Sequence, residues 1–478
     1  MQTLTRDRDA FSQGKPLWSR AIATSAVEFG PTPLPVLSGQ IPDGLRGSLY
    51  RNGAGRLERG GQSIDHWFDG DGGILAIHFS DDGATGLYKY VQTEGFQTEE
   101  SANQFIYGGY SRMVSGPFWK RWGAQPKNAA NTSVLALPDK LLALWEAGNP
   151  HALDLETLET LGLDDLGLLQ PGQPYSAHPR WDPKTGDLYN FGVVSGRKNY
   201  IQLYRSDATG QIQQQDQISL PRTTLVHDFV LAGSYLVFLV PPVVLSILPI
   251  LLGTQGFSDA LRWQPKYGTQ IIVVDRHTLQ EVSRIETDPW FQWHFGNGYQ
   301  ADDGAVVIDY ARYENFDTNR WLKEFVEGYP VTPASAKLFR LRLDVTAGKV
   351  LSNELQSDLE CEFPIVAPHE VGHHHNSLFF CYKSQPINEE YFDSIGGLES
   401  DSGRVNLMTF DKGSYPIEPI YVPNPQGSGW LLTVVFDGKQ DQSTVQILQA
   451  DNLDAGPVCI LDLPKIIPFG FHGTWKSH

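Results

Sequence analysis

Short β-type runs separated by turn residues recur along the whole chain and constrain its fold most. No long apolar pattern with a helical period competes with them. Several runs end in a similar corner centred on an aspartate, and these corners lie roughly 50 to 70 residues apart, at Asp154, Asp207, Asp275, Asp344 and Asp411. The pattern predicts an all-β fold built from a repeated unit. Dividing 478 residues by seven gives about 68 residues per unit, which suits a seven-bladed β-propeller with long insertions.

Composition excludes several classes of protein. The chain has 37 Lys and Arg against 55 Asp and Glu, a net charge of −18, which argues against a nucleic-acid partner. Its three cysteines, Cys361, Cys381 and Cys459, are too few and too dispersed for a disulfide framework and favour the reducing cytoplasm. Residues 1–21 lack the apolar core of a secretory signal. We expect one domain over residues 1–478, with residues 1–20 as a flexible N-terminal extension.

An uncharged stretch of 18 residues, YLVFLVPPVVLSILPILL at 235–252, is the one segment that approaches the length of a membrane span. Its prolines at 241, 242 and 249 would each remove a helical hydrogen bond. We therefore predict a strand over 235–240, a break at the two adjacent prolines, and then a short apolar piece. A piece of ten residues rises only about 15 Å as a helix and does not cross a bilayer.

The segment HEVGH at residues 369–373 spells the H-E-x-x-H motif of zinc proteases, and an E-x-x-x-D pattern follows at 389–393. That chemistry requires two histidines one helical turn apart, with the glutamate as general base. Pro368 precedes the motif, Gly372 weakens any helix there, and the flanking residues suggest strands. A zinc protease is thus an alternative that the context disfavours, and the competing interpretation is a histidine-rich, solvated loop.

A second metal hypothesis uses single histidines far apart in the sequence: His178, His227, His294 and His472. They stand at predicted strand ends, at intervals of 49, 67 and 178 residues, so a propeller would place them on different blades. Inner strands converge on the propeller axis, where four imidazoles can meet at one ion. Imidazole suits iron, zinc, copper and nickel, so the ligand type does not name the metal. The competing interpretation of each residue is a core histidine bonded to a backbone carbonyl.

Nine motifs along the chain carry a family resemblance. They are LRGSLYRNGAG (45–55), HWFDGDGG (66–73), ANTS (130–133), LLALWEAGNPH (141–151), SAHPRWDP (176–183), VHDF (226–229), EFPIV (362–366), EPIYVPNP (418–425) and FHGTW (471–475). In this order they resemble the carotenoid cleavage oxygenases, and most closely the cyanobacterial apocarotenoid-cleaving branch, over residues 38–478. The resemblance implies a seven-bladed propeller with four axial histidines, one non-haem Fe²⁺ per chain, and long loops that form a cap over the metal.

The resemblance also implies residue roles. It carries the four ligands to His178, His227, His294 and His472, and the carboxylates behind them to Glu146, Glu362 and Glu418. A carboxylate that accepts the second N–H of a ligand histidine fixes its tautomer and ring orientation. Members often have a second histidine after the third ligand, followed by an Asn-Ala-aromatic segment, where this chain has Phe295 and the sequence NGY at 297–299. No catalytic side chain beyond the metal site is predicted.

Aromatic and apolar residues suggest how a polyene would reach the metal. Trp145, Trp293 and Tyr310 are candidates for the wall of a substrate tunnel, although each also suits an ordinary core position. The apolar piece after the proline pair is a candidate membrane patch, with a dimer or core contact as the alternative. Its predicted members are Val243, Val244, Leu245, Ile247, Leu248, Ile250, Leu251 and Leu252.

The sequence thus predicts a cytoplasmic, peripherally membrane-bound oxygenase. It would use Fe²⁺ and O₂ to cleave a C=C bond of a carotenoid or apocarotenoid, giving apocarotenal or retinal-like aldehydes. Two other functions stay open. Relatives of the same family cleave stilbenoids, which do not need a membrane patch, and a propeller can also be a binding scaffold without chemistry.

Overall fold

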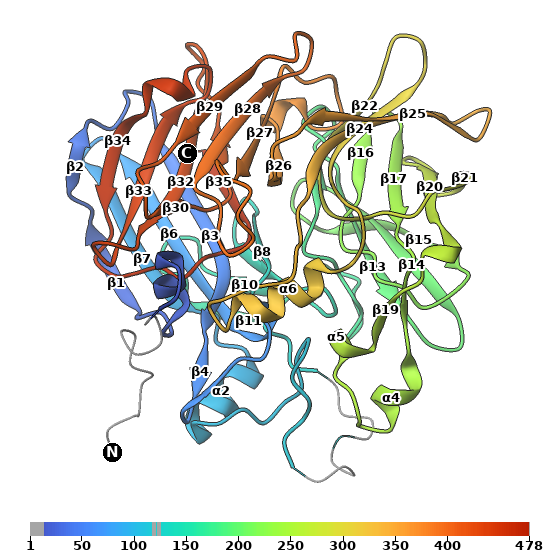
Figure 1. Ribbon diagram of the computed structural model, residues 1–478, viewed down its shortest axis with the longest axis horizontal. Helices are drawn as coiled ribbons and strands as arrows, with labels where there is room; N and C mark the ends of the chain where they lie inside the picture. Colours follow the sequence, from blue (N-terminus) through green and yellow to red (C-terminus); the bar gives the residue numbers. More distant parts are fainter. Residues whose placement is uncertain (1–13, 117–120, 122–125, 478) are drawn as a thin grey trace.

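The structure is a computed structural model, which describes residues 14–116, 121 and 126–477. The fold is all-β, and its sheets are arranged as a propeller (Figure 1). Seven sheets of four to six strands are formed by the described residues. Residues from the first strands of six of these sheets border one cavity, which therefore marks the centre of the arrangement. The all-β prediction is confirmed.

Each sheet can be followed from its innermost strand outward. The first sheet contains β35 (Gly473–Ser477), β3 (Gly47–Arg56), β6 (Asp71–Ser80), β7 (Gly83–Tyr90) and β1 (Phe29–Pro33). The second contains β8 (Ser133–Ala136), β9 (Leu141–Leu144), β10 (His151–Leu153) and β11 (Thr160–Leu163). The third contains β12 (Arg180–Trp181), β13 (Leu188–Val194), β14 (Asn199–Ser206) and β15 (Ile212–Leu220). The fourth contains β16 (Val230–Ala232), β17 (Tyr235–Val240), β20 (Thr269–Asp275) and β21 (Glu281–Thr287).

The remaining sheets continue in the same way. The fifth contains β22 (Phe291–Gln300), β23 (Val306–Tyr313), β24 (Lys337–Asp344) and β25 (Lys349–Ser357). The sixth contains β26 (Cys361–Ile365), β27 (Ser377–Tyr382), β28 (Ser394–Glu399) and β29 (Val405–Thr409). In the seventh, β30 (Ser414–Pro416) and β31 (Ile420–Val422) both pair with β32 (Trp430–Asp437), followed by β33 (Gln442–Gln449), β34 (Pro457–Asp462) and β2 (Val36–Gly39).

The smaller elements lie between these strands. Two short ribbons pair β4 (Glu58–Arg59) with β5 (Gln62–Ser63) and β18 (Val243–Leu245) with β19 (Leu261–Trp263). The α-helices are α2 (Glu94–Ala102), α4 (Ile247–Leu251), α5 (Phe257–Ala260) and α6 (Thr318–Phe325). The 3₁₀ helices are η1 (Leu17–Ile22), η2 (Trp67–Asp69), η3 (Pro265–Tyr267), η4 (Pro368–Glu370) and η5 (Leu453–Ala455). No helix among the described residues is long and apolar enough to span a membrane.

The two ends of the chain complete sheets that belong to the opposite end. The C-terminal β35 pairs antiparallel with β3, so it becomes the innermost strand of the first sheet. The N-terminal β2 pairs antiparallel with β34 and becomes the outermost strand of the last sheet. Because each terminal strand is hydrogen-bonded to a sheet formed elsewhere in the chain, the first and last sheets are tied together.

Four of the five predicted aspartate corners are confirmed. Asp154, Asp207, Asp275 and Asp344 each lie in the hairpin that joins the third and fourth strands of a sheet. The Asp275 carboxylate shows the reason, because its Oδ1 accepts the backbone N–H groups of residues 277 and 278 at 3.0 and 2.8 Å. The fifth position, Asp411, instead lies between the sixth and seventh sheets.

The sequence of β17 is continuously apolar because both faces of the strand are buried. Successive side chains of a strand point to opposite faces. Leu236 and Phe238 pack in one core cluster against the third sheet, while Val237 and Leu239 pack in another against the fifth sheet. Leu236, Phe238, Val237 and Leu239 are all 0% exposed. The predicted strand over 235–240 is therefore confirmed, as a core strand between two sheets.

The N-terminal prediction needs correction for residues 14–20, whereas residues 1–13 lie outside the described part. Trp18, in η1, is 0% exposed and its ring stacks on Phe325 at 4.6 Å. Its indole Nε1 donates a hydrogen bond to the backbone oxygen of Glu389 at 2.7 Å. This segment is part of the core, since burial of a large aromatic ring opposes fraying.

Candidate metal centre

The four dispersed histidines stand where the innermost strands of four different sheets begin. His178 precedes β12, His227 precedes β16, His294 lies in β22, and His472 directly precedes β35. Their candidate ligand nitrogens all lie within 4.8 Å of one another. Among the described residues, this is the only group of three or more His, Cys, Asp or Glu side chains that meets the geometry of a metal site.

The spacing of the ring nitrogens fits a single ion. His178 Nε2 is 3.0 Å from His227 Nε2, which is 3.4 Å from His294 Nε2. Two nitrogens bound to one ion at about 2.1 Å and at right angles would be about 3.0 Å apart. Burial, reinforced by the three neighbouring imidazoles, holds the pKa of His178 well below its usual range. That ring is therefore neutral and keeps the lone pair that a metal requires.

Two of the predicted glutamates hold the far side of their histidines. His294 Nδ1 lies 2.6 Å from Glu362 Oε2, and His472 Nδ1 lies 2.7 Å from Glu418 Oε1. An ionised carboxylate only accepts hydrogen bonds, so each Nδ1 carries the proton and each Nε2 presents its lone pair to the centre. These contacts fix both the tautomer and the orientation of the two rings.

The third glutamate has a looser geometry. Glu146 Oε1 is 3.3 Å from His227 Nδ1 and 3.6 Å from His178 Nε2, and its side chain is 32% exposed. The fourth ring, His178, has Asp228 as its carboxylate neighbour at Nδ1, at 4.0 Å. One histidine of the four therefore lacks a close carboxylate partner, as the family resemblance implied.

Backbone irregularities direct His294 and Glu362 toward the centre. The register of β22 against β23 shifts on both sides of Phe295, and that of β26 against β27 shifts after Glu362. Phe363, in the second bulge, adopts a left-handed φ of 56°. A bulge re-aims side chains that a regular strand would alternate between faces. The Phe363 ring stacks on that of His294 at 5.2 Å.

A buried arginine, which the sequence prediction missed, completes the polar shell. Arg51 in β3 donates to the backbone oxygen of Glu418 at 2.6 Å, and its guanidinium is 3.3 Å from Glu418 Oε2. Burial alone would raise the pKa of Glu418, but His472 and Arg51 together keep it below its usual value. Arg51 lies in one of the motifs that carry the family resemblance, so it could have been noticed there.

The charges around the four rings match a divalent cation. Glu146, Glu362 and Glu418 supply three negative charges, and Arg51 supplies one positive charge. The imidazoles act as neutral ligands. Two negative charges are thus left without a compensating group in this shell. A dication at the common point of the nitrogens neutralises them.

Two further polar contacts, also missed, support the shell. The Tyr313 hydroxyl donates to Glu362 Oε1 at 3.0 Å, so both carboxylate oxygens of that glutamate are held. Burial, together with the Glu362 charge, raises the pKa of Tyr313 well above its usual value and keeps it a donor. Asp228 accepts from Arg180 at 2.5 Å and from the backbone N–H of Phe295 at 3.1 Å, which ties the His227 segment to β22.

The HEVGH segment does not form a metal site. It begins in a 3₁₀ turn rather than an α-helix, and His369 is exposed. Glu370 is buried and its Oε1 accepts from the backbone and side chain of Asn376 at 3.0 and 2.7 Å. The solvated-loop interpretation is also wrong in part, because the neighbouring His375 is 0% exposed and its Nε2 lies 3.1 Å from Asp309.

Asn297, which the chain shares with the Asn-Ala-aromatic segment of the family, has a structural role. Asn297 Nδ2 donates to the backbone oxygens of Glu370 and His373 at 3.1 and 2.8 Å, and its Oδ1 accepts from Gly372 N at 3.0 Å. Asn297 therefore ties the strand that carries His294 to the HEVGH loop. That loop has a structural role in this chain.

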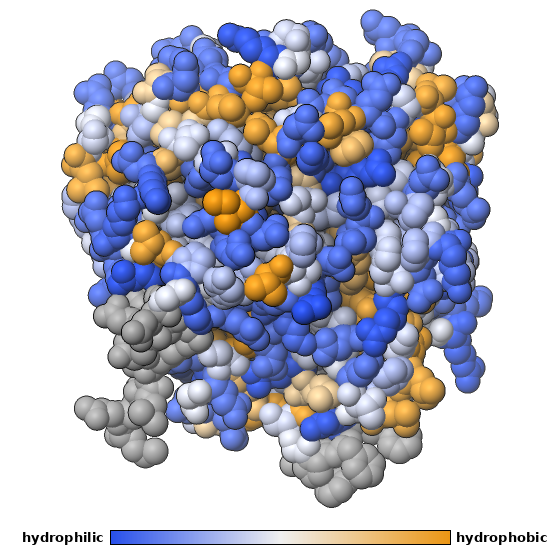
Figure 2. Space-filling model, in the orientation of Figure 1, coloured by the Kyte–Doolittle hydropathy of each residue, from blue (hydrophilic) through white to orange (hydrophobic). Residues whose placement is uncertain are grey.

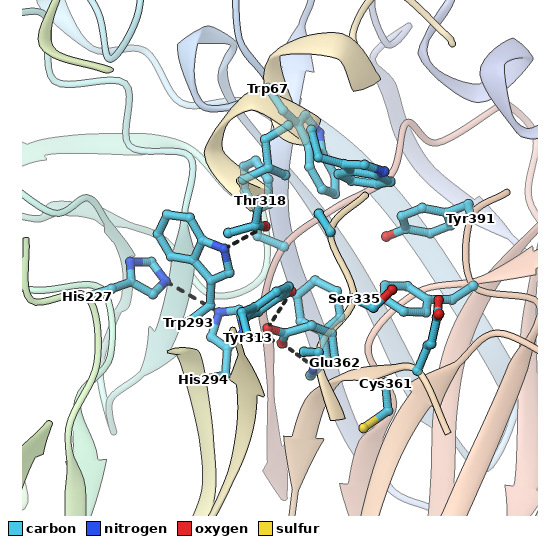
Figure 3. Close-up of a pocket in the computed structure, with 18 of the residues that line it drawn as sticks. Trp67, His227, Trp293, His294, Tyr313, Thr318, Ser335, Cys361, Glu362 and Tyr391 are labelled. Atoms are coloured by element: carbon cyan, nitrogen blue, oxygen red, sulfur yellow. Dashed lines mark hydrogen bonds and ion pairs between the residues drawn. The ribbon is translucent and has the colours of Figure 1, made fainter. Parts of the chain in front are cut away.

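Two cavities meet at the histidines. The inner cavity is the one lined by His294, Glu362 and Tyr391, and the outer cavity is the one lined by Trp145, Ile250 and Phe257. Both are lined by Phe68, Thr132, His227 and Trp293, so they adjoin at these residues. Figure 3 shows the inner cavity, with Trp293 between His227 and Thr318. Adjoining cavities with largely apolar walls beside a metal position suit an apolar ligand.

Of the three predicted tunnel residues, two line the cavities and one lies in the core. Trp293 lines both cavities and Trp145 lines the outer one. Tyr310 is 0% exposed, and its ring packs among the aromatic side chains between the fourth and fifth sheets. Its hydroxyl donates to Asn353 at 3.0 Å, so it is a core residue and its predicted place in the tunnel wall is wrong.

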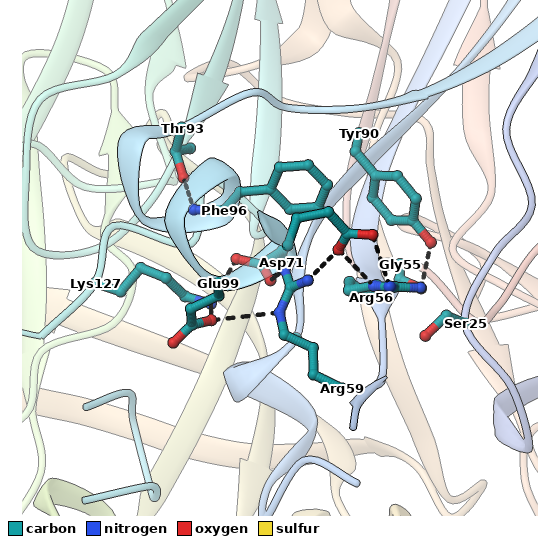
Figure 4. A network of polar contacts seen from close by, with 12 residues as sticks. Ser25, Gly55, Arg56, Arg59, Asp71, Tyr90, Thr93, Phe96, Glu99 and Lys127 are labelled. Atoms are coloured by element: carbon teal, nitrogen blue, oxygen red, sulfur yellow. Dashed lines mark hydrogen bonds and ion pairs between the residues drawn. The ribbon is translucent and has the colours of Figure 1, made fainter. Parts of the chain in front are cut away.

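A buried ion network holds the cavity wall that carries Thr132. Lys127, five residues earlier, lies 2.6 Å from Asp71 and 2.7 Å from Glu99 of α2, and Arg59 pairs with the same two carboxylates (Figure 4). All four side chains are less than 10% exposed. Removing one member would leave buried charge unpaired, which is strongly destabilising. The network fixes the start of the segment that leads to Thr132.

The predicted membrane patch is smaller than the sequence suggested. Val243 is 0% exposed and belongs to the core, while Val244, Leu245 and Ile250 are half-buried. The exposed members are Ile247, Leu248 and Leu252, at 38%, 66% and 59%. The side chain of Leu251 lies outside the described part. Helix α4 projects at the lower edge of the molecule in Figure 1, and hydrophobic residues are visible there in Figure 2.

Comparison with known proteins agrees with this site. Residues 22–477 match the RPE65 family, described as retinal pigment epithelial membrane protein. The chain is 33% identical over 455 residues to apocarotenoid-15,15′-oxygenase of Synechocystis sp., covering 92% of each chain. It is 25% identical over 466 residues to resveratrol cleavage oxygenase 1 of Aspergillus fumigatus, covering 91% of each. A solved structure of cobalt-substituted Synechocystis apocarotenoid oxygenase superposes with a TM-score of 0.86, at 30% identity, covering 99% of each chain.

Proposed function

Because the chain belongs to the RPE65 and carotenoid oxygenase family, we propose that it is an Fe²⁺-dependent oxygenase that cleaves a C=C bond of a carotenoid or apocarotenoid. The observation that carries the proposal is a four-histidine centre placed where two apolar cavities meet. In the reaction, R–CH=CH–R′ and O₂ give R–CHO and R′–CHO. Both bonds of the alkene are broken, and each of its carbons gains one oxygen atom.

Iron is the proposed metal, held by His178, His227, His294 and His472. Four neutral imidazoles suit Fe²⁺, and the surrounding charge suits a dication. When bound, Fe²⁺ supplies the redox chemistry that lets O₂ react with an alkene. The cobalt-substituted relative supports a site that accepts divalent transition metals.

The protein's own groups would position the alkene and exclude water. Trp293 packs against the His227 ring at 4.8 Å and faces both cavities, so it borders the place where a polyene would pass the metal. Phe68 packs edge-on to Trp293 at 5.7 Å. Aromatic faces bind a planar polyene by dispersion and displace water from its surface. Glu362 and Glu418 meanwhile hold two ligand rings in one orientation.

We infer a seven-bladed propeller in which each sheet of four or more strands is one blade. The chain order of these sheets and the pairing of both chain ends support this assignment. The cap over the metal would consist of the connections that carry η2, α4, α5 and α6. Residues of all four lie among the walls of the two cavities.

We also propose that the exposed side chains of α4 anchor the enzyme to a membrane, from which an apolar substrate enters. Ile250 and Phe257, beside these side chains, line the outer cavity that leads to the histidines. The exposed leucines and isoleucine follow two prolines and carry no charge, so the attachment would be apolar, peripheral and reversible. The cytoplasmic side is the proposed location, since all three cysteines are free and buried.

Replacing Ile247, Leu248 and Leu252 with serine is expected to lower the affinity of the protein for liposomes at least about tenfold. Transfer of each such side chain into an apolar phase contributes about 1.5–3 kcal/mol when complete. The net charge of −18 should repel anionic headgroups, so salt should not release the wild type. Sedimentation with liposomes measures both effects. The matched control replaces Leu161 and Leu163 of β11, which are 63% and 65% exposed, and should pellet like the wild type.

The deciding experiment for the substrate is chromatography of products after incubation with apocarotenals, carotenes and stilbenes. We expect aldehyde products from a polyene and none from stilbenes. Cleavage of stilbenes alone would establish the rival function within the family, which the Aspergillus relative keeps open. The two adjoining cavities and the apolar α4 favour the polyene, because a stilbenoid is smaller and more water-soluble.

A further inference from the structure

The inner cavity is lined by two kinds of side chain. Many of them are aromatic, as expected for a hydrocarbon chain. Its lining also includes Glu360, at the entrance to β26, and Lys383, just past the end of β27, together with Tyr391 from the following loop. A hydrocarbon gains nothing from an ammonium, a carboxylate and a phenol, and burying these groups is unfavourable. Their presence therefore requires an explanation.

Lys383 is buried with spare hydrogen-bonding capacity. It is 8% exposed, and burial lowers the pKa of its ammonium group. Its Nζ donates to the backbone oxygen of Ile387 at 3.1 Å, whereas Glu360 Oε2 lies 3.9 Å away, beyond hydrogen-bond length. A lysine ammonium has three N–H donors. Glu360 Oε2 is buried and accepts no hydrogen bond from the described residues.

Tyr391 provides a second donor in a fixed position. Its ring stacks on Phe469 at 4.4 Å and packs against Phe392 at 5.1 Å, so the hydroxyl cannot swing away. Tyr391 is 2% exposed, yet its hydroxyl has no hydrogen-bond partner among the described residues. Leaving a buried hydroxyl unpaired is unfavourable. In Figure 3 Tyr391 and His227 lie on opposite sides of the cavity, and the Tyr391 hydroxyl points into the cavity.

We propose that Tyr391, Lys383 and Glu360 form a polar subsite for an oxygen-bearing end group of the substrate, a hydroxyl or a carbonyl. The tyrosine and lysine would donate to the oxygen, and the glutamate would accept from a hydroxyl. The inference rests on the proposed function, because it concerns the half of a polyene that lies in the inner cavity. An end group fixed there sets which C=C bond lies at the metal, so the subsite determines specificity.

The oxygen can come from either end of an apocarotenoid, from a hydroxyl on the ring or from the carbonyl at the chain end. Three ligands of matched length distinguish these two sources of the oxygen. They are an aldehyde with a plain ring, the same aldehyde with a ring hydroxyl, and a methyl-ended hydrocarbon with a plain ring. Affinities are measured without O₂, by quenching of tryptophan fluorescence, so that no cleavage occurs. The test variants are Tyr391→Phe and Lys383→Met, and the matched control is Tyr204→Phe, a buried tyrosine in the third sheet.

We expect the wild type to bind one oxygenated ligand about tenfold more tightly than its partner without that oxygen. Both test variants should abolish this preference, while the control retains it. Loss of the preference for the aldehyde would place the chain end in the inner cavity, and loss of the preference for the ring hydroxyl would place the ring there. Tyr391→Phe keeps the stacked ring, so it decides the question even if Lys383→Met does not fold.

Three results would overturn the subsite. They are a wild type without any preference, test variants that keep it, and a control that loses it to the same extent. The proposed function fails separately, if the wild type with iron and O₂ cleaves none of the ligands. A protein that cleaves polyenes but binds all three ligands equally would retain the function and lose the subsite.

Discussion

Replacing His227 with alanine is expected to remove bound iron and to reduce oxygenase activity at least about a hundredfold while the protein stays folded. His227 Nε2 is the nitrogen closest to two other ligands, at 3.0 Å from His178 and 3.4 Å from His294. Its loss leaves three imidazoles, and Glu146 loses its contact with His227 Nδ1 at 3.3 Å. Iron per chain by mass spectrometry, circular dichroism and product formation are the measurements.

His472→Ala should behave in the same way, since the site depends on all four rings. The control is the double variant His369→Ala and His373→Ala in the HEVGH segment, which should keep iron and activity. His369 is exposed, and His373 lies beside Lys184 and Asp182. Neither belongs to the four-histidine centre. Full iron content in the His227 or His472 variant, or metal loss only in the HEVGH variant, would refute the assignment.

The repeated unit could be predicted because its signals are local. A corner aspartate bonds to backbone N–H groups two and three residues ahead, so Asp275 marks its hairpin without help from the rest of the chain. The strand at β17 was likewise marked by its own apolar run and by the proline pair after it. Residues 14–20 could not be predicted, because the binding surface for Trp18 is formed by Phe325, some 300 residues away.

The ligand histidines could be found because each is flanked by a recognisable motif. The supporting groups were harder, since their roles depend on three-dimensional contacts. Arg51 and Tyr313 reach Glu418 and Glu362 from other sheets. Arg51 lies in a family motif, but the motif does not indicate which residue its guanidinium contacts, and Tyr313 lies in none of the nine motifs. Tyr310 was misassigned for a related reason. It occupies an alternating position in β23, and only the packing shows that its face meets the neighbouring sheet.

The patch on α4 shows where hydropathy misleads. The sequence treats residues 243–252 as one apolar unit, but β18 pairs with β19 and turns Val243 into the core. Exposure then concentrates on Ile247, Leu248 and Leu252. Hydropathy alone does not separate buried from exposed apolar residues, because both kinds occur in folded proteins. Which members of the predicted patch are exposed is therefore decided by tertiary structure.

Glu362→Gln is expected to lower activity by about tenfold or more while the fold and most of the iron are retained. The carboxylate accepts three hydrogen bonds, from His294 Nδ1 at 2.6 Å, Tyr313 at 3.0 Å and the backbone of Phe363 at 2.7 Å. A glutamine of the same shape has one accepting oxygen and an NH₂ group that only donates. At least one of the three donors must then lose its acceptor, and the hydrogen bond that orients the His294 ring loses its charged acceptor.

The matched control is Glu370→Gln, a buried glutamate that bonds to Asn376 outside the metal shell, and it should leave turnover unchanged. Wild-type turnover in Glu362→Gln would show that the carboxylate does not orient His294. Loss of iron as complete as in the His227 variant would show that Glu362 governs metal retention rather than ring orientation.

Tyr313→Phe separates the two side-chain contacts of Glu362. Alone it removes one donor and leaves His294 with its full, charged acceptor, so the expected loss of activity is only about twofold to fivefold. In the Glu362→Gln background the phenol no longer competes for the single accepting oxygen. The double variant should therefore be less impaired than the product of the two single effects. Strictly multiplicative effects would mean that Tyr313 and His294 do not share the Glu362 carboxylate, contrary to the contacts at its two oxygens.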